Sequence, residues 1–84
     1  MALAGERFVH FLVDLDGRPP QRCRISFTAL AIMEGGVPLG AHRDQAMRVF
    51  IKHRRMIEAI ARIKISRLTE PAKWISIGVD DLTL

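Results

Sequence analysis

The sequence predicts a small α+β domain with the order β-β-α-α-β, in which a three-stranded antiparallel sheet is covered on one face by a short and a long helix. Two observations lead to this prediction. Segments with apolar residues at every second position lie near both ends of the chain, two of them on either side of a turn signal. Between them, residues 42–68 contain no glycine or proline, and their apolar residues recur at spacings of three and four.

The first strand is expected at residues 7–15, which are rich in β-branched and aromatic residues. Apolar residues from Val9 to Leu15 alternate at a period of two and define the buried side. Phe8 and Leu12 fall on the opposite side of this strand. That second side is therefore expected to be partly apolar as well.

A hairpin is expected next, because Asp16-Gly17 is a strong turn signal. The two prolines that follow cannot donate to a ladder, so we expect a loop of about four or five residues. The second strand is then predicted at residues 21–25, antiparallel to the first, with Cys23 pointing inward.

A short helix is predicted at residues 27–33, since Ser26 is a favourable N-cap residue. Gly35-Gly36 is expected to end it, because glycine adopts the left-handed conformation at low cost. Residues 37–41 contain a proline and a glycine and are expected to form an irregular connection.

The long helix is predicted across residues 42–68. Even 24 of these 27 residues in a straight helix would span roughly 36 Å, so the helix should overhang the sheet or meet another chain. Arg48, Arg55 and Arg62 are expected to point away from the core. Its apolar stripe is predicted to comprise Ala46, Val49, Phe50, His53, Met56, Ile57, Ile60, Ile63 and Leu68.

The helix should end before Pro71, because the residue preceding a proline disfavours helical geometry. A third strand is predicted at residues 73–79, with Ile75 and Ile77 on the buried side and Trp74 on the other. An acidic tail follows. The whole chain, residues 1–84, is expected to be one domain, with residues 1–6 and 81–84 flexible.

Composition limits the class of protein. Apolar residues make up 49% and charged residues 26% of the chain, as in an ordinary globular domain. No apolar run approaches the roughly 20 residues of a membrane span, and no signal peptide is recognised, so we expect a cytoplasmic protein that does not enter membranes. The histidines and the single cysteine lack metal-ligand spacing, and we predict no metal and no cofactor.

Positive charge is concentrated in the predicted long helix. Residues 42–68 carry eight basic and two acidic side chains, a net charge of +6, whereas the whole chain has +4. Such a concentration attracts anionic partners.

The order of elements, together with several short motifs, resembles a family of small proteobacterial proteins, the family known as domain of unknown function number 1488. The resemblance covers roughly residues 8–82 and implies a small α+β fold. It implies no activity, since that family has no established catalytic or binding residues. The matching positions are Cys23, Arg24, Ile25, Ser26, Ala29, Leu30, Ala46, Phe50, His53, Arg54, Ile57 and Glu58.

The most suggestive cluster of polar residues lies in the middle of the predicted long helix and comprises His53, Arg54, Arg55, Glu58 and Arg62. In a functional interpretation, His53 faces a cleft between helix and sheet, and the arginines bind phosphate or carboxylate. The alternative is a histidine at the edge of the core and a surface ion pair worth about 0.3–0.5 kcal/mol.

Two further surfaces are candidates. Arg22, Arg24 and Arg48 could form part of a basic surface that follows a nucleic-acid backbone, although we expect the outer sheet face to lack the paired aromatic residues of a base-stacking platform. Phe8, Leu12 and Trp74 could form an interface between two copies, since tryptophan is typical of interface hot spots. The alternative is that Trp74 is buried under the N-terminal segment.

Cys23 could be activated by the arginines on either side of it, which would lower its pKa. Because its side chain should point into the core, we expect an inert thiol instead.

Two functions follow from these observations. The first is a non-enzymatic interaction or accessory module, homodimeric through the long helix or the uncovered sheet face. The alternative is a nucleic-acid-binding module that uses the basic helix. An enzyme is the third choice, because no nucleophile–base pair and no metal set is found in the sequence.

Overall fold

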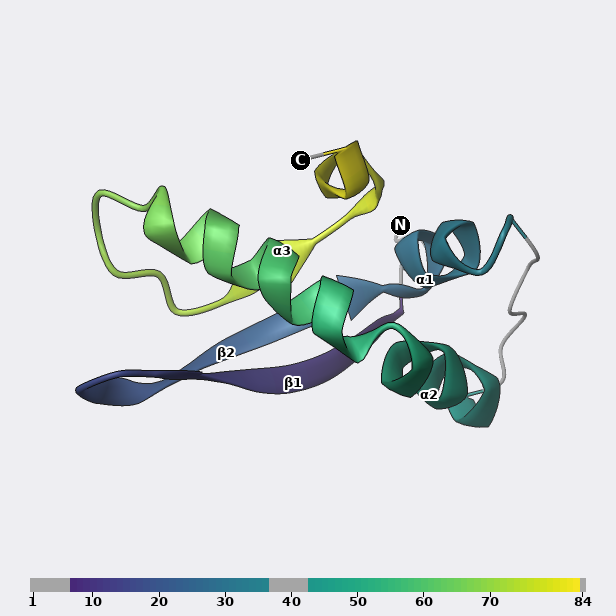
Figure 1. The fold of residues 1–84 in the computed structure, drawn as a ribbon, viewed down its shortest axis with the longest axis horizontal. Helices are drawn as coiled ribbons and strands as arrows, with labels where there is room; N and C mark the ends of the chain where they lie inside the picture. Colours follow the sequence, from purple (N-terminus) through teal and green to yellow (C-terminus); the bar gives the residue numbers. More distant parts are fainter. Residues whose placement is uncertain (1–6, 37–42, 84) are drawn as a thin grey trace, which may run out of the picture.

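The computed structural model describes residues 7–36 and 43–83. Their three strands and three α-helices confirm the α+β class, and the helices gather on one face of the sheet (Figure 1). The predicted connection at residues 37–41 and the flexible segment at residues 1–6 lie outside the described residues. The elements are β1 (Phe8–Leu15), β2 (Arg18–Ser26), α1 (Phe27–Met33), α2 (Arg43–Lys52), α3 (Arg54–Ser66), β3 (Ile75–Ile77) and the 3-10 helix η1 (Val79–Thr83).

The β1–β2 hairpin is tighter than expected. β2 begins directly after Asp16-Gly17, and Gly17 has a positive φ of 70°, which glycine adopts without strain. The predicted loop of four or five residues is therefore wrong. The two prolines fit into β2 because β3 pairs only with residues 23–25, and because a register shift between Val13 and Leu15 loosens the ladder beside them.

The sheet is mixed, with the strand order β1-β2-β3. β1 and β2 are antiparallel as predicted, but β3 runs parallel to β2, with Cys23 opposite Ile75 and Ile25 opposite Ile77. The prediction of a purely antiparallel sheet is wrong. The reason is that the three helices carry the chain back toward the hairpin end before β3 begins, which is the connection that parallel strands require.

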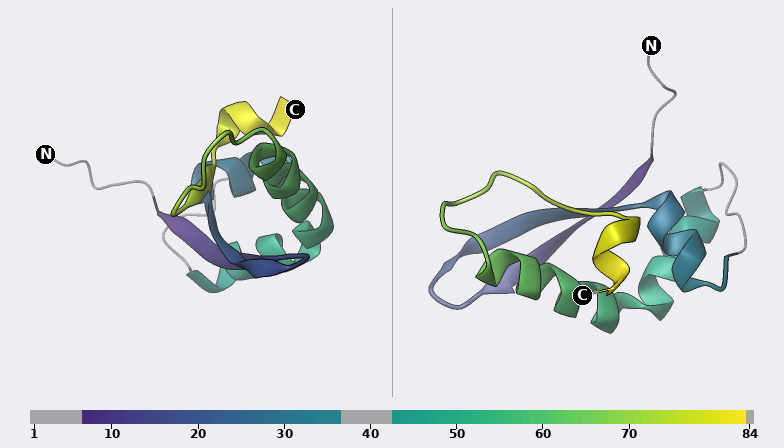
Figure 2. Two further views of the ribbon diagram at one scale, coloured as in Figure 1. Left: turned by 90° about the vertical axis from the view of Figure 1, so that its left-hand side faces the viewer. Right: turned by 90° about the horizontal axis from the view of Figure 1, so that it is seen from above.

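The predicted long helix is two helices that meet at His53 (Figure 2). Helical hydrogen bonds continue on both sides of the junction, from His53 N–H to the Val49 carbonyl and from Ile57 N–H to the His53 carbonyl. The axis therefore bends without a full break, at a residue with φ −106° and ψ 16°. The bend lets both helices remain on the core, where a straight helix of this length would overhang.

The buried stripe differs in part from the predicted one. Met56, Ile63 and Leu68 are exposed, whereas the other apolar members predicted on the stripe are buried. Cys23 and Ile25 are fully buried, as the alternation in β2 predicted. The core contains Val9, Val13, Cys23, Ile25, Ala29, Leu30, Ala46, Val49, Phe50, Ile57, Ile60, Ala61, Ile75 and Ile77.

Both ends of α1 are formed as predicted, by a cap at Ser26 and by the glycine pair. The Ser26 hydroxyl accepts a hydrogen bond from Ala29 N–H at 3.0 Å and caps the N-terminus. Gly35 and Gly36 have φ angles of 92° and 86°, and Gly36 N–H returns to the Ala31 carbonyl at 2.8 Å. This turn places Glu34, the C-cap residue, next to the bend between α2 and α3.

Candidate nucleic-acid interface

The cluster predicted around His53 is found at the bend between α2 and α3. His53, Arg54, Arg55 and Glu58 line a shallow hollow of about 610 Å³ on the helical surface, and Arg62 is not among its lining residues. His53 points toward α1, where its Nε2 atom lies 3.1 Å from Glu34 Oε1, and not into a cleft between helix and sheet.

Most charges in this hollow already have partners. Glu34 also accepts a hydrogen bond from Lys52 Nζ at 3.0 Å, and the hydrogen bonds from His53 and Lys52 lower the pKa of the Glu34 carboxyl. Arg54 Nε donates to Glu58 Oε2 at 2.9 Å. The contacts of Glu34 connect the end of α1 to α2 and to the start of α3, whereas the Arg54–Glu58 pair lies within α3. These contacts give the cluster a structural role.

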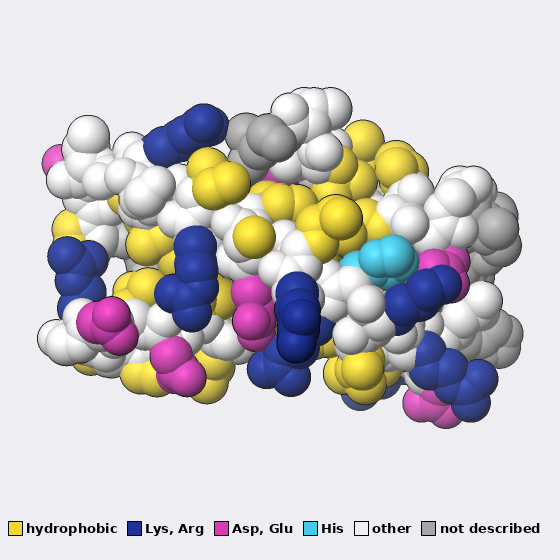
Figure 3. All heavy atoms as spheres, viewed as in Figure 1, with side chains coloured by type: hydrophobic (Ala, Val, Ile, Leu, Met, Phe, Trp, Pro, Cys, Tyr) yellow, Lys and Arg dark blue, Asp and Glu magenta, His cyan; other side chains and the backbone are white. Residues whose placement is uncertain are grey.

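Basic side chains on the helical face are interrupted by apolar ones. Arg48, Arg55 and Arg62 are exposed as predicted, but Met56 and Ile63 are exposed on α3 as well. Figure 3 shows hydrophobic and basic side chains alternating over the helices instead of a continuous basic strip.

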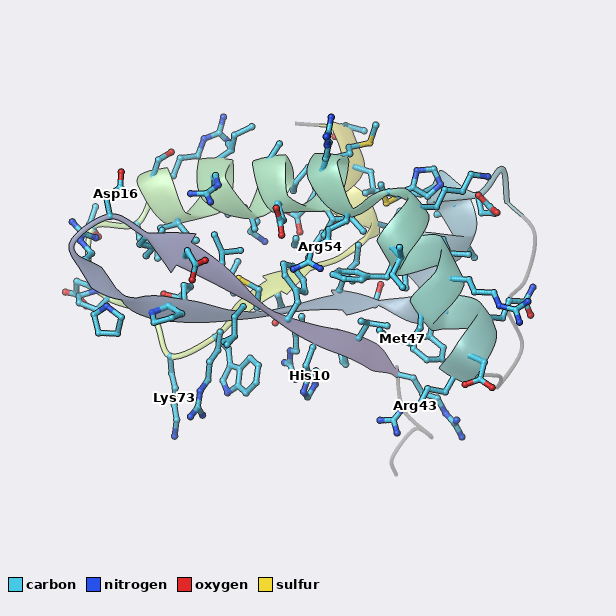
Figure 4. All side chains as sticks on the ribbon, turned by 60° about the horizontal axis from the view of Figure 1, so that its bottom comes forward. His10, Asp16, Arg43, Met47, Arg54 and Lys73 are labelled. Carbon is cyan, nitrogen blue, oxygen red and sulfur yellow. The ribbon has the colours of Figure 1, made fainter. Side chains whose placement is uncertain are left out.

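The outer face of the sheet presents a different composition. In the hairpin, His10 lies opposite Arg24 and Leu12 lies opposite Arg22, so each pair shares a face. All four belong to the face away from the core, because the alternate residues of both strands are the buried ones. Figure 4 shows His10 and Lys73 pointing away from the helices, on the side of the sheet that no described helix covers.

Aromatic rings and arginines are in contact on this face. The rings of His10 and Trp74 have centroids 5.0 Å apart at an angle of 54°. The Arg22 guanidinium lies 5.8 Å from the Trp74 ring, and the Arg24 guanidinium lies 4.3 Å from the Phe8 ring. We call these five residues, Phe8, His10, Arg22, Arg24 and Trp74, the sheet-face cluster.

The cluster is positively charged and held in place by the sheet. Arg24 Nε donates to the Ser76 hydroxyl at 2.8 Å, which fixes the guanidinium across β3. Within the described residues, no carboxylate lies within 4.0 Å of the basic groups of Arg22 or Arg24. Two guanidinium groups without carboxylate partners therefore lie beside aromatic rings, that of Arg22 exposed and that of Arg24 partly exposed. This arrangement is suited to an anionic ligand with flat groups.

A cleft of about 820 Å³ continues from one end of the cluster. It lies between the hairpin end and residues 68–73, and Arg18, Arg22 and Lys73 supply its basic groups. Gln21 Nε2 donates to the Ala72 carbonyl at 3.1 Å and joins the two walls. Arg22 belongs to both the cleft and the sheet-face cluster, so the two adjoin each other, although Glu70 also lines the cleft.

Part of this surface was predictable from the sequence. Phe8, Leu12 and Trp74 lie on the outer face as predicted, with Leu12 55% exposed. The expectation that this face lacks paired aromatic residues is wrong, because it omitted His10. The signal was present in the sequence, since His10 lies between Phe8 and Leu12 at the period of two that defines one side of a strand.

Cys23 is not part of any reactive site in this fold. Its side chain is fully buried, and burial raises the pKa of its thiol to about 11. The native protein is expected to react with a thiol reagent such as DTNB at pH 8 at least about a hundredfold more slowly than the denatured protein, because the thiolate is the reacting form. Reaction of the folded protein at the rate of the unfolded control would contradict the burial.

The part of the chain that the structure describes contains no group of three or more His, Cys, Asp or Glu side chains that could hold a metal ion. Within residues 7–36 and 43–83, no helix is both long enough and apolar enough to cross a bilayer.

Comparisons of the chain with protein-family models, with curated proteins and with solved structures find no match. The resemblance to the family of domain of unknown function 1488 therefore stays a prediction. The function proposed below is therefore inferred from the contacts and charges of the sheet-face cluster.

Proposed function

We propose that this protein binds single-stranded nucleic acid on the outer face of its sheet. The observation that carries the proposal is the sheet-face cluster, in which each arginine lies over or beside an aromatic ring on an uncovered face. Single-stranded nucleic acid binds proteins through base stacking on aromatic rings and through basic groups that follow the phosphates. Both kinds of group are present within one sheet face.

Each residue of the cluster has a defined part in this proposal. Trp74 and Phe8, with His10 between them on the sheet, offer rings that can accept about two or three stacked bases. Arg22 and Arg24 are placed to bind phosphates, and Arg22 directs the backbone toward the cleft that Lys73 also lines. Stacking of this kind tolerates many sequences, because every base has a flat face.

The sheet face is a better candidate for the nucleic-acid site than the basic helical surface predicted from the sequence. On the helices, Lys52, Arg54 and Lys64 are engaged with carboxylates. Exposed apolar side chains separate the remaining arginines there. On the sheet, the guanidinium groups lie next to rings that bases can use.

The chain's only tryptophan lies in the cluster, so its fluorescence reports directly on binding. Titration with single-stranded oligo(U) or oligo(dT) at low salt is expected to quench Trp74 emission, because stacked bases quench indoles. The affinity should fall as salt rises, since phosphate contacts release counterions. An unchanged emission at all oligonucleotide concentrations, or an affinity independent of salt, would overturn the proposal.

Two matched double variants locate the site. Arg22→Ala combined with Arg24→Ala is expected to weaken binding by about tenfold or more, because two phosphate contacts are lost. Arg55→Ala combined with Arg62→Ala removes the same charge from the helical face and should change affinity less than about twofold. The anisotropy of a labelled oligonucleotide measures both. A larger loss in the helical variant would assign binding to the helices and contradict the sheet site.

A further inference from the structure

β1 is an edge strand whose outward backbone groups can be identified. The Arg7 carbonyl accepts a hydrogen bond from Phe27 N–H at 2.8 Å. In an antiparallel ladder, hydrogen-bonded and non-hydrogen-bonded pairs alternate, so the odd-numbered residues of β1 bond to β2. The N–H and C=O groups of Phe8, His10 and Leu12 therefore point to the free edge.

This edge lacks the usual protection against strand pairing. Sheet edges are commonly shortened, bent by bulges or guarded by lysine and proline. β1 has eight residues, contains neither lysine nor proline, and has its register shift only at the end, beyond Val13. The opposite edge, β3, has three residues and is followed at once by η1. Among the described residues, no side chain bonds to the outward groups of β1.

Apolar side chains border the same edge. Figure 4 shows Met47 and Arg54 on the side of the helical layer that lies beside β1. Met47 and Ile51 are one turn apart on α2 and both are exposed, Ile51 to 64%. Leu12 is exposed on the sheet side. An occupant of the edge would thus bury apolar surface in addition to forming backbone hydrogen bonds.

We propose that a second copy of this chain pairs with the free edge, β1 against β1, antiparallel about a two-fold axis at His10. A strand edge is self-complementary in this arrangement, since each outward N–H meets an outward C=O of the other copy. With His10 opposite His10 of the second copy, Phe8 lies opposite Leu12 of the second copy. Three pairs then exchange about six hydrogen bonds. The product is one continuous six-stranded sheet that carries two sheet-face clusters on the same side.

The assembly state tests the proposal. Sedimentation of the full chain at high micromolar concentration is expected to show a dimer. His10→Pro removes an N–H that only the second copy uses, so it should yield a folded monomer with unchanged far-UV circular dichroism. Leu12→Lys retains every backbone group and is expected to raise the dimer dissociation constant at least about tenfold. Ile63→Lys, on the exposed side of α3, is the matched control and should remain dimeric.

Cross-linking tests the register. Residue 10 of the two copies would lie about 5.5 Å apart between Cα atoms, so His10→Cys should be joined by a short bismaleimide, whereas Asp14→Cys should not. Cys23 is buried and does not interfere. A monomeric wild-type chain overturns the proposal, as does a dimer lost in Ile63→Lys but kept in Leu12→Lys. The dimer proposal does not rest on nucleic-acid binding, because sedimentation and cross-linking are measured without any oligonucleotide. The two proposals can also fail separately: Leu12→Lys adds positive charge to the sheet face, so its monomer should still bind oligonucleotides.

Discussion

Ile57→Ala is expected to lower the free energy of unfolding by about 2–5 kcal/mol, the range for truncating a buried isoleucine to alanine. Ile57 is fully buried in the first turn of α3, directly after the bend at His53. Truncation removes its contacts and leaves a cavity beneath the junction of two helices. For a domain of 84 residues, stability of roughly 0.05–0.15 kcal/mol per residue makes this a large part of the total.

Thermal and urea denaturation, followed by far-UV circular dichroism, measure the effect. Tm should fall by more than about 8 °C, since each kcal/mol shifts a domain of this size by about 4–8 °C. Met56→Ala is the matched control, because Met56 precedes Ile57 in the helix but is 58% exposed. Its change should stay within about 0.5 kcal/mol. An equal decrease in the free energy of unfolding in the two variants would contradict the burial of Ile57, because α3 would then pack on the core through a different side.

Lys64→Met is expected to destabilise the protein by about 1.5–3 kcal/mol, the range for hydrogen bonds that involve charged groups. Lys64 Nζ donates to the Ser76 carbonyl at 2.6 Å and to Asp81 Oδ2 at 2.9 Å, and so joins α3 to β3 and η1. The side chains of Lys64 and Asp81 are only 29% and 20% exposed. Methionine keeps the aliphatic stem but leaves the Asp81 carboxylate without its cation.

The destabilisation should depend on pH. Burial of Asp81 acts to raise its pKa, but the Gly78 N–H and the Lys64 ammonium outweigh burial and lower it below the ordinary value. A lowered folded-state pKa stabilises the protein above the unfolded pKa of about 3.9, and this contribution is lost as pH falls through the folded pKa. The difference between wild type and variant should therefore be largest near pH 7 and shrink below about pH 4. Part of the stability difference should remain at acid pH, because the hydrogen bond from Lys64 to the Ser76 carbonyl does not require an ionised carboxylate.

Lys52→Met provides the comparison. Lys52 also forms an ion pair, with Glu34, but its side chain is 64% exposed. Exposed pairs contribute about 0–1 kcal/mol, so this variant should unfold close to wild type at every pH. Equal unfolding of the Lys64 variant and wild type at pH 7 would contradict the role given to the Lys64–Asp81 pair.

Much of the fold follows from local pattern. Alternation identified β1 and the buried side of β2, and the Ser26 cap and the glycine pair bounded α1. The direction of β3 could not be predicted in this way, because alternation is the same for parallel and antiparallel pairing. The bend at His53 has no glycine or proline to signal it. At the bend, His53 contacts Glu34, which lies 19 residues earlier, and both helices pack on one core. Neither contact can be read from the local sequence.

The candidate site was predictable in composition but not in assembly. Alternation alone places Phe8, His10 and Leu12 on one side of a strand. Which side chains of the other strands meet them depends on register, and Arg24 is set opposite His10 by pairing that no short motif encodes. Trp74 joins His10 only because β3 lies beside β2.

β2 has a further consequence for how this protein can vary. It is the central strand, and its two sides serve the core, through Cys23 and Ile25, and the sheet-face cluster, through Arg22 and Arg24. Substitution of the arginines would change the proposed nucleic-acid surface while the core residues of β2 stay the same. A single-residue insertion or deletion within this strand would instead exchange its two sides, because side chains alternate at a period of two. The outer surface of β2 can therefore change by point substitution, whereas a change in the length of β2 would disrupt the core.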